Sequence, residues 1–80
     1  MQPARPVLAA APTRGRVPPV NDRDLELLRH LAAGLSTART AAAMSITTNT
    51  VRTRIRRLER KFSVVGRDQV VDCAGEHGLV

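Results

Sequence analysis

The spacing of the large apolar side chains between residues 48 and 62 restricts this stretch to one kind of secondary structure. Val51, Ile55, Leu58 and Phe62 follow one another at intervals of four, three and four residues. An α-helix places such positions on one narrow stripe, whereas a half-buried strand requires strict alternation. All other side chains of the stretch are polar. We therefore predict a helix that buries one stripe and exposes the rest of its surface.

An earlier helix is expected to begin at Asp22. Asn21 can cap it by accepting a hydrogen bond from the amide of Asp24, whose carboxylate can answer in a capping box. Gly34 suits its end, where a left-handed backbone conformation is common. Its apolar residues recur three and four positions apart, which indicates one buried face. They are Leu25, Leu28, Leu31, Ala32 and Leu35.

Two shorter helices complete the prediction. Ser36 can cap one that reaches about Met44, and its alanines would let a neighbouring helix approach closely. The other covers about residues 67–77, carries apolar residues on one side and ends at Gly78. No segment shows the alternation of a strand. The alanines are Ala38, Ala41, Ala42 and Ala43, and the apolar residues of the last helix are Val70, Val71 and Ala74.

A three-residue break separates the second helix from the third. Ile46 can fill the angle between the two helices, and Thr47 can cap the second of them. This spacing is typical of a helix-turn-helix. We therefore predict an all-α, four-helix domain over residues 20–80, preceded by a flexible tail over residues 1–19. The tail holds all five prolines and three of the arginines, Arg5, Arg14 and Arg16.

The length of 80 residues allows one small domain and no deep substrate pocket. No nucleophile with a base, no glycine-rich phosphate loop and no cofactor motif is present, so we expect neither an enzyme nor a cofactor. His30 and His77 lie on different predicted helices without an acidic cluster at ligand spacing, so we expect no metal site. Cys73 is the single cysteine, which excludes an internal disulfide and leaves a bridge between two chains open.

Charge points to the kind of partner. Thirteen basic residues against seven acidic ones give a formal net charge of +6, which favours a polyanion. No stretch has the roughly 18 to 20 apolar residues that cross a bilayer, and the N-terminus lacks the apolar core of a secretory signal. We therefore expect a soluble, cytoplasmic protein that has no membrane partner.

The excess charge is concentrated on the third helix. Residues 52–61 contain six basic side chains and one acid, Glu59. At about 100° per residue, the direction opposite to the apolar stripe falls on Asn49, Thr53, Arg56 and Arg60, with Arg52 and Arg57 beside them. Such a face fits duplex DNA, since arginine pairs with guanine, asparagine with adenine, and threonine's methyl group touches that of thymine.

We assign two sets of contacts to this face. The residues expected to read bases are Asn49, Arg52, Thr53 and Arg56. Those expected to hold phosphates and set the register are Thr47, Thr48, Thr50, Arg54, Arg57, Arg60 and Lys61. A solvated charged face without a ligand is the alternative interpretation, and the preceding turn and the scarcity of acids weigh against it.

Five stretches resemble the LuxR/GerE/FixJ-type helix-turn-helix family, over residues 20–80. They are Arg23-Asp24-Leu25-Glu26-Leu27-Leu28, Ala33-Gly34-Leu35-Ser36, Thr50-Val51-Arg52-Thr53-Arg54, Arg60-Lys61-Phe62-Ser63-Val64 and Gly78-Leu79-Val80. The resemblance implies four helices with the third in the major groove, base-reading roles at Arg52, Thr53 and Arg56, and a two-fold dimer through the fourth helix. The expected dimer contacts are Val70, Val71, Cys73 and Ala74.

The chain also departs from the family's pattern. Arg39 and Thr40 stand where the family usually has Glu and Ile, and Arg54 stands where it usually has His, so the family's packing of the second helix and its phosphate contacts do not carry over directly to this chain. Full-length members usually carry an N-terminal receiver or ligand-binding domain, for which 19 tail residues leave no room. We therefore expect a stand-alone effector domain or a fragment.

Three alternatives remain at this point. RNA binding fits the charge, but single-stranded RNA modules stack bases on aromatic rings, and Phe62 is the only aromatic residue. A module related to region four of sigma factors would instead dock on RNA polymerase or another regulator. The arginines of the tail could also follow a minor groove, against the simpler interpretation of a solvated leader.

Overall fold

The computed structural model of the protein describes residues 17–80. In chain order these residues form α3 (Asp22–Ala32), α4 (Thr37–Met44), α5 (Thr48–Phe62) and α6 (Arg67–Glu76), and they contain no strand. The predicted all-α, four-helix class is confirmed. Most of the predicted tail, residues 1–16, lies outside the described residues.

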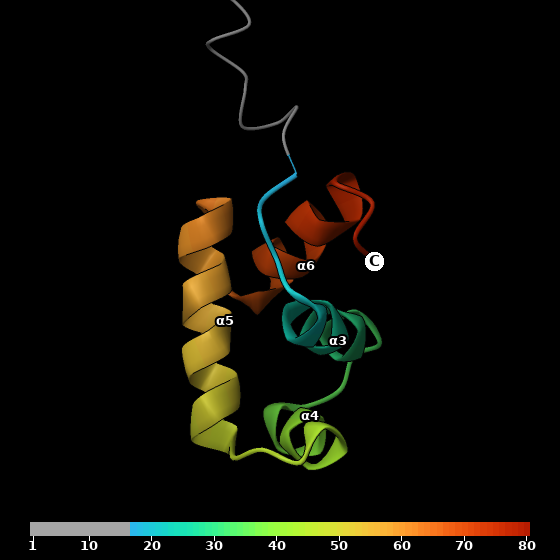
Figure 1. The fold of residues 1–80 in the computed structure, drawn as a ribbon, viewed down its shortest axis with the longest axis vertical. Helices are drawn as coiled ribbons and strands as arrows, with labels where there is room; N and C mark the ends of the chain where they lie inside the picture. The colour runs from blue at the N-terminus through green and yellow to red at the C-terminus, as the bar shows by residue number, and fades with distance from the viewer. Residues whose placement is uncertain (1–16) are drawn as a thin grey trace, which may run out of the picture.

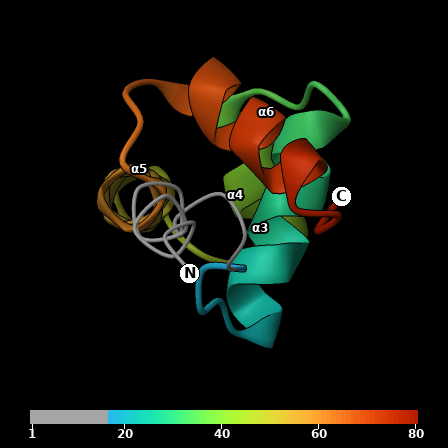
Figure 2. The same ribbon diagram turned by 90° about the horizontal axis from the view of Figure 1, so that it is seen from above.

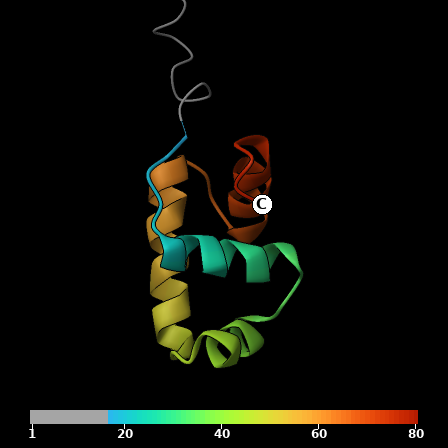
Figure 3. The same ribbon diagram turned by 45° about the vertical axis from the view of Figure 1, so that its right-hand side comes forward.

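The longest helix, α5, forms one side of the domain (Figure 1). Figure 3 shows α3 crossing α5 near its middle, α4 at the end where α5 begins, and α6 beside its later half. α5 packs against both α4 and α6, and α3 packs against the same two helices. α4 and α6 thus pack against α5, and α3 packs against both of them.

Local signals set the helix ends as predicted. The amide of Asp24 donates to Asn21 Oδ1 at 2.8 Å, and the amide of Asn21 donates to Asp24 Oδ2 at 3.3 Å, which completes the capping box. Ser36 Oγ accepts from the amide of Arg39 at 3.1 Å and caps α4. Gly34, just after α3, has a φ of +86°. These caps satisfy backbone groups that would otherwise lack partners.

The core is a single cluster in which every helix takes part. The predicted stripe of α5 contributes Val51, Leu58 and Phe62 as buried residues, whereas Ile55 is only half buried. Val20 and Leu25 pack on its edge. The remaining buried apolar residues are Leu27, Leu28, Leu31, Ala41, Met44, Val70 and Ala74.

The buried faces of α3 and α4 differ in detail from the prediction. Leu27 is fully buried, and Ala32, expected on the buried face of α3, is exposed. The reason is that α3 contacts helices on two sides, so its buried arc is centred between Leu27 and Leu28. In α4 only Ala41 among the alanines is buried, beside Thr40 and Met44, because this short helix packs through one narrow stripe.

Order also begins earlier than predicted. Pro18 is buried, and Lys61 Nζ donates to the carbonyl of Pro19 at 2.9 Å. The last part of the predicted tail therefore lies against the end of α5. Within residues 17–80, no helix combines the length and apolar character that a bilayer crossing requires.

One substitution is expected to have opposite effects at two glycines. Gly34→Ala should lower the free energy of unfolding by about 1 kcal/mol, because alanine is strained at a φ of +86°. Gly75→Ala should raise it by about 0.5 kcal/mol, because Gly75 lies within α6 and an added Cβ meets nothing within 4 Å. Urea unfolding followed by circular dichroism measures both, and equal signs would contradict the assigned backbone conformations.

Candidate nucleic-acid interface

The start of α5 is fixed by the turn that precedes it. Ser45 ends α4 in a left-handed conformation with a φ of 57°, and the amide of Ile46 donates to the carbonyl of Ala41 at 3.0 Å. The side chain of Ile46 packs against the core, as predicted. Thr47 Oγ1 then accepts from the amide of Thr50 at 3.1 Å, which caps α5. The turn therefore sets the direction in which α5 leaves the core.

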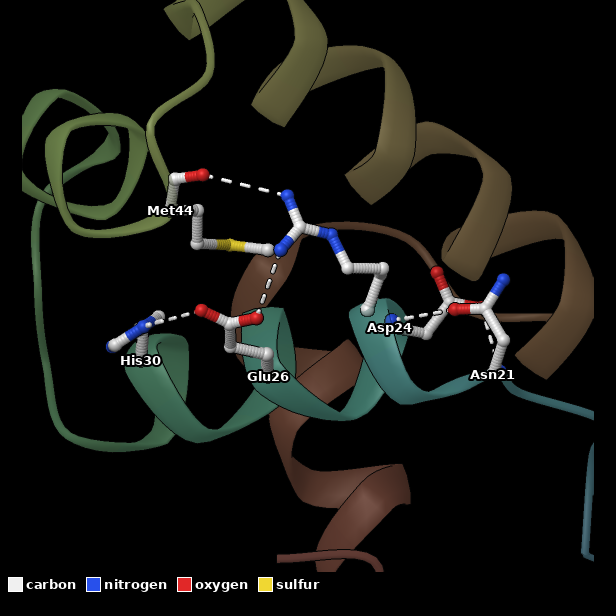
Figure 4. Close-up of polar contacts among 6 residues, drawn as sticks. Asn21, Asp24, Glu26, His30 and Met44 are labelled. Carbon is white, nitrogen blue, oxygen red and sulfur yellow. Dashed lines mark hydrogen bonds and ion pairs between the residues drawn. The ribbon is translucent and has the colours of Figure 1, made fainter.

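The turn is also attached to α3. Arg23 Nη2 donates to the carbonyl of Met44 at 3.4 Å, and Arg23 Nη1 lies 3.2 Å from Glu26 Oε1. Figure 4 shows these contacts as dashed lines. On the other side of the Glu26 carboxylate, His30 Nε2 lies 3.9 Å from Glu26 Oε2. An arginine at the C-terminal end of a helix can satisfy one of its last carbonyl groups. Arg23 thus links α3 to the last turn of α4.

The outward face of α5 is open along its length. Seen end-on in Figure 2, α5 has α3, α4 and α6 all on one side of it. The four candidate base-reading side chains, Asn49, Arg52, Thr53 and Arg56, are all exposed. Nothing in residues 17–80 packs over this face, so a ligand as large as a DNA duplex can approach it.

Two of these side chains are joined. Arg52 Nη1 donates to Asn49 Oδ1 at 3.3 Å, one helical turn earlier. The contact leaves the amide nitrogen of Asn49 and the other guanidinium nitrogens of Arg52 for a ligand. It also reduces the rotamer freedom that both side chains would otherwise lose on binding.

The candidate phosphate residues differ in their surroundings. Thr47, Thr48, Thr50 and Arg60 lie at the surface in varying degrees, as expected of groups that meet a backbone. Arg54 is different, because its Nη1 is buried and has no hydrogen-bond partner among the described residues. The position explains the burial, since Arg54 lies next to the apolar stripe of α5.

Arg57 and Lys61 share an acidic neighbour that sequence reasoning assigned only to helix capping. Asp24, with 1% of its side chain exposed, lies 3.7 Å from Arg57 Nη2 through Oδ1 and 3.7 Å from Lys61 Nζ through Oδ2. Figure 4 shows Asp24 at the start of α3, with α5 running past it. The only sequence signal for this pairing was the capping box, which fixes Asp24 locally but does not reveal which helix it faces.

The single acid of the basic stretch is turned toward the protein. Glu59 Oε2 accepts from the amide of Gly66 at 2.7 Å and so holds the loop between α5 and α6. Arg67 reaches from the start of α6 to the carbonyl of Leu35. Glu59 therefore orders a loop and leaves the outward face of α5 without an acidic side chain.

The four predicted dimer residues on α6 are not equally accessible. Val70 and Ala74 are 0% exposed and belong to the core, whereas Val71 and Cys73 are half buried. A second copy that docks on α6 would therefore meet Val71 and Cys73 first. Dimer formation stays a prediction.

In residues 17–80 no three His, Cys, Asp or Glu side chains gather as a metal site would require.

Comparison with known proteins decides the family. The family described as GerE, bacterial regulatory proteins of the luxR family, matches residues 20–74. The chain belongs to this family. The match begins at the residue before the capping box and includes the turn and the whole of α5. Comparison with curated proteins and with solved structures gave no match.

Membership in this family indicates the general function of the helix-turn-helix described above. The luxR family is a family of DNA-binding regulatory domains and not of enzymes, so this chain is a helix-turn-helix regulator that binds DNA. The resemblance inferred from the sequence is thereby confirmed. The departures at Arg39, Thr40 and Arg54 lie inside the matched region, and the structure places Thr40 in the core and Arg39 at the surface.

Proposed function

We propose that the protein is a sequence-specific regulator of transcription that inserts α5 into the major groove of duplex DNA. The observation that supports this most is the open face of α5, with Asn49, Arg52, Thr53 and Arg56 exposed and the other three helices behind it. The major groove is wide enough to admit a helix of this kind. Since bacterial chromosomal DNA lies in the cytoplasm, this role implies a cytoplasmic protein.

The base-reading chemistry follows from the exposed groups. Arg56 is exposed and can donate two hydrogen bonds from its guanidinium, one to O6 and one to N7 of a guanine. Asn49 and Arg52, which are already joined, act as one donor surface near the start of α5. Thr53, between them and Arg56, offers a methyl group to thymine.

The backbone contacts come from the two ends of the face. The amides at the N-terminus of α5 carry partial positive charge, and Thr47, Thr48 and Thr50 lie there. Arg57, Arg60 and Lys61 lie toward the other end. Arg54, whose Nη1 is buried, contributes through its remaining guanidinium nitrogens. Such contacts set register and carry no sequence information directly.

The proposal includes binding as a two-fold dimer. One helix reads few base pairs, so two copies on repeated half-sites gain both affinity and specificity. The contact would form around Val71 and Cys73, which are half buried on the two flanks of the stripe that carries the buried Val70 and Ala74. The small exposed apolar area of α6 suggests a dimer that forms on DNA rather than before it.

Selection of bound sites from a random duplex library tests the proposal as a whole. We expect an enriched motif with two inverted half-sites and two protein chains per duplex. A motif with a single unrepeated element, bound by one chain, would contradict the dimer. No enrichment, together with equal binding to heparin and to any duplex, would contradict sequence-specific reading.

Loss of a phosphate contact should leave sequence preference unchanged. Arg57→Ala is expected to weaken binding to the selected site and to random duplex by similar factors. It should also flatten the dependence of log K on log salt by about one unit, because one fewer counterion is released. Titrations over a salt series with both DNAs measure this, and a loss confined to the selected site would assign Arg57 to base reading.

A further inference from the structure

Asp24 is the most deeply buried charged group in the described residues. Its side chain is 1% exposed, although it lies at the start of a helix whose neighbouring acid, Asp22, is exposed. A buried carboxylate is costly unless hydrogen bonds and opposite charges surround it. The groups that lie near its two carboxylate oxygens are therefore the ones that stabilise its charge.

The two oxygens have different partners. Oδ2 accepts from the amide of Asn21 at 3.3 Å and lies 3.7 Å from Lys61 Nζ. Oδ1 has no hydrogen-bond partner among residues 17–80, and Arg57 Nη2 lies 3.7 Å from it. Lys61 is further occupied, because its Nζ also donates to the carbonyl of Pro19. The negative charge on Oδ1 is therefore directed at Arg57.

Arg57 has room for a second anion. Its side chain remains 45% exposed, and it stands on the shoulder of the face that carries Thr53 and Arg56. A guanidinium has five donors in a rigid fork, so one nitrogen can face a carboxylate while others meet a phosphate. The ammonium group of a lysine is a point charge and cannot present a second edge in this way.

We propose that Asp24 is a positioning residue for DNA binding, which orients the guanidinium of Arg57 toward a phosphate at the edge of the groove read by α5. This inference rests on the proposed function. Asp24 does not touch DNA itself and acts through Arg57. Together with its capping box, it makes the first turn of α3 a fixed support for the later half of α5.

The proposal predicts an effect opposite in sign to that of simple charge. Removing an acid from a DNA-binding protein raises its net charge, which by itself strengthens binding. Asp24→Asn should nevertheless weaken binding about three- to tenfold on selected and random duplexes, because Arg57 loses its orientation and must be ordered on binding. The asparagine oxygen can still accept from the amide of Asn21, which preserves the cap.

Asp22→Asn is the matched control. It removes the same charge from the same helical turn, but Asp22 is exposed and has no ion pair with α5 among the described residues. Binding should tighten by less than about threefold. Circular dichroism melts of both variants accompany the titrations, so that a loss of folding is measured separately.

A double-mutant cycle tests whether Asp24 acts through Arg57. We expect Asp24→Asn to weaken binding in the wild-type background and to have no weakening effect in the Arg57→Ala background. Tighter binding by Asp24→Asn, equal to that of Asp22→Asn, would overturn the proposal. An equal weakening in both backgrounds would overturn it as well.

Arg57→Lys keeps the inference testable even if Asp24→Asn fails to fold. This variant preserves charge, and we expect it to bind about three- to tenfold more weakly, since the ammonium group is drawn to Asp24 alone. Arg29→Lys, at an exposed position on α3, serves as control. Wild-type affinity in Arg57→Lys would overturn the inference. Absence of specific binding by the wild type would instead overturn the proposed function.

Discussion

Replacing Arg56 by alanine is expected to weaken binding to the selected duplex by about 1 to 3 kcal/mol and binding to random duplex by much less. The reason is that a guanidinium paired with O6 and N7 of guanine makes two hydrogen bonds that depend on the base. Arg56 is exposed at the centre of the open face of α5, so alanine removes it without disturbing the core.

The measurement compares Arg56→Ala with Arg57→Ala on both duplexes over the same salt series. Arg56→Ala should reduce the ratio of specific to random affinity, whereas Arg57→Ala should preserve this ratio and lower the salt dependence. The residues are adjacent on one helix and carry the same side chain, and Arg57 in addition faces the buried carboxylate of Asp24. Equal losses for Arg56→Ala on the two duplexes would show that another face of α5 reads the bases.

The helices of this domain could be predicted from sequence because their signals are local. The stripe of Val51, Leu58 and Phe62 and the caps at Asn21, Ser36 and Thr47 lie within a few residues of what they determine. Such signals need no knowledge of the rest of the fold. The same holds for the exposed face of α5, which follows from the position of its apolar stripe.

What could not be predicted depends on which helices become neighbours. Periodicity placed Ala32 on the buried face of α3 and left Leu27 out, because the width of a buried arc is set by the number of helices that cover it. The pairing of Asp24 with Arg57 and Lys61 joins residues more than thirty positions apart. A capping box explains why an acid stands at Asp24, but it says nothing about the charges brought against it.

In the candidate site, too, local geometry could be predicted, whereas contacts between helices could not. Helical geometry correctly anticipated that Asn49, Arg52, Thr53 and Arg56 would be exposed. It treated Arg54 and Arg57 as equivalent phosphate contacts, although one has a buried nitrogen and the other faces a buried carboxylate. Their difference arises because Arg54 lies next to the apolar stripe, whereas Arg57 lies farther from it and faces the first turn of α3.

Leu58→Ala is expected to have the largest effect on stability, about 2 to 5 kcal/mol. Leu58 is fully buried in the later half of α5, where it belongs to the core cluster, and alanine would leave a cavity there. A small domain has a total stability of roughly 5 kcal/mol or somewhat more, so this loss would leave a measurable unfolded fraction at 25 °C.

Urea unfolding followed by circular dichroism measures the loss, with Val65→Ala as the control. Val65 is also apolar, but it is 79% exposed in the loop after α5, so its truncation should change stability by less than about 0.5 kcal/mol. Because DNA binds the folded state only, saturating duplex should restore much of the folded population of Leu58→Ala. A loss below about 1 kcal/mol would mean that α5 is not held to the core through its apolar stripe, and the orientation of its reading face would then lack its structural basis.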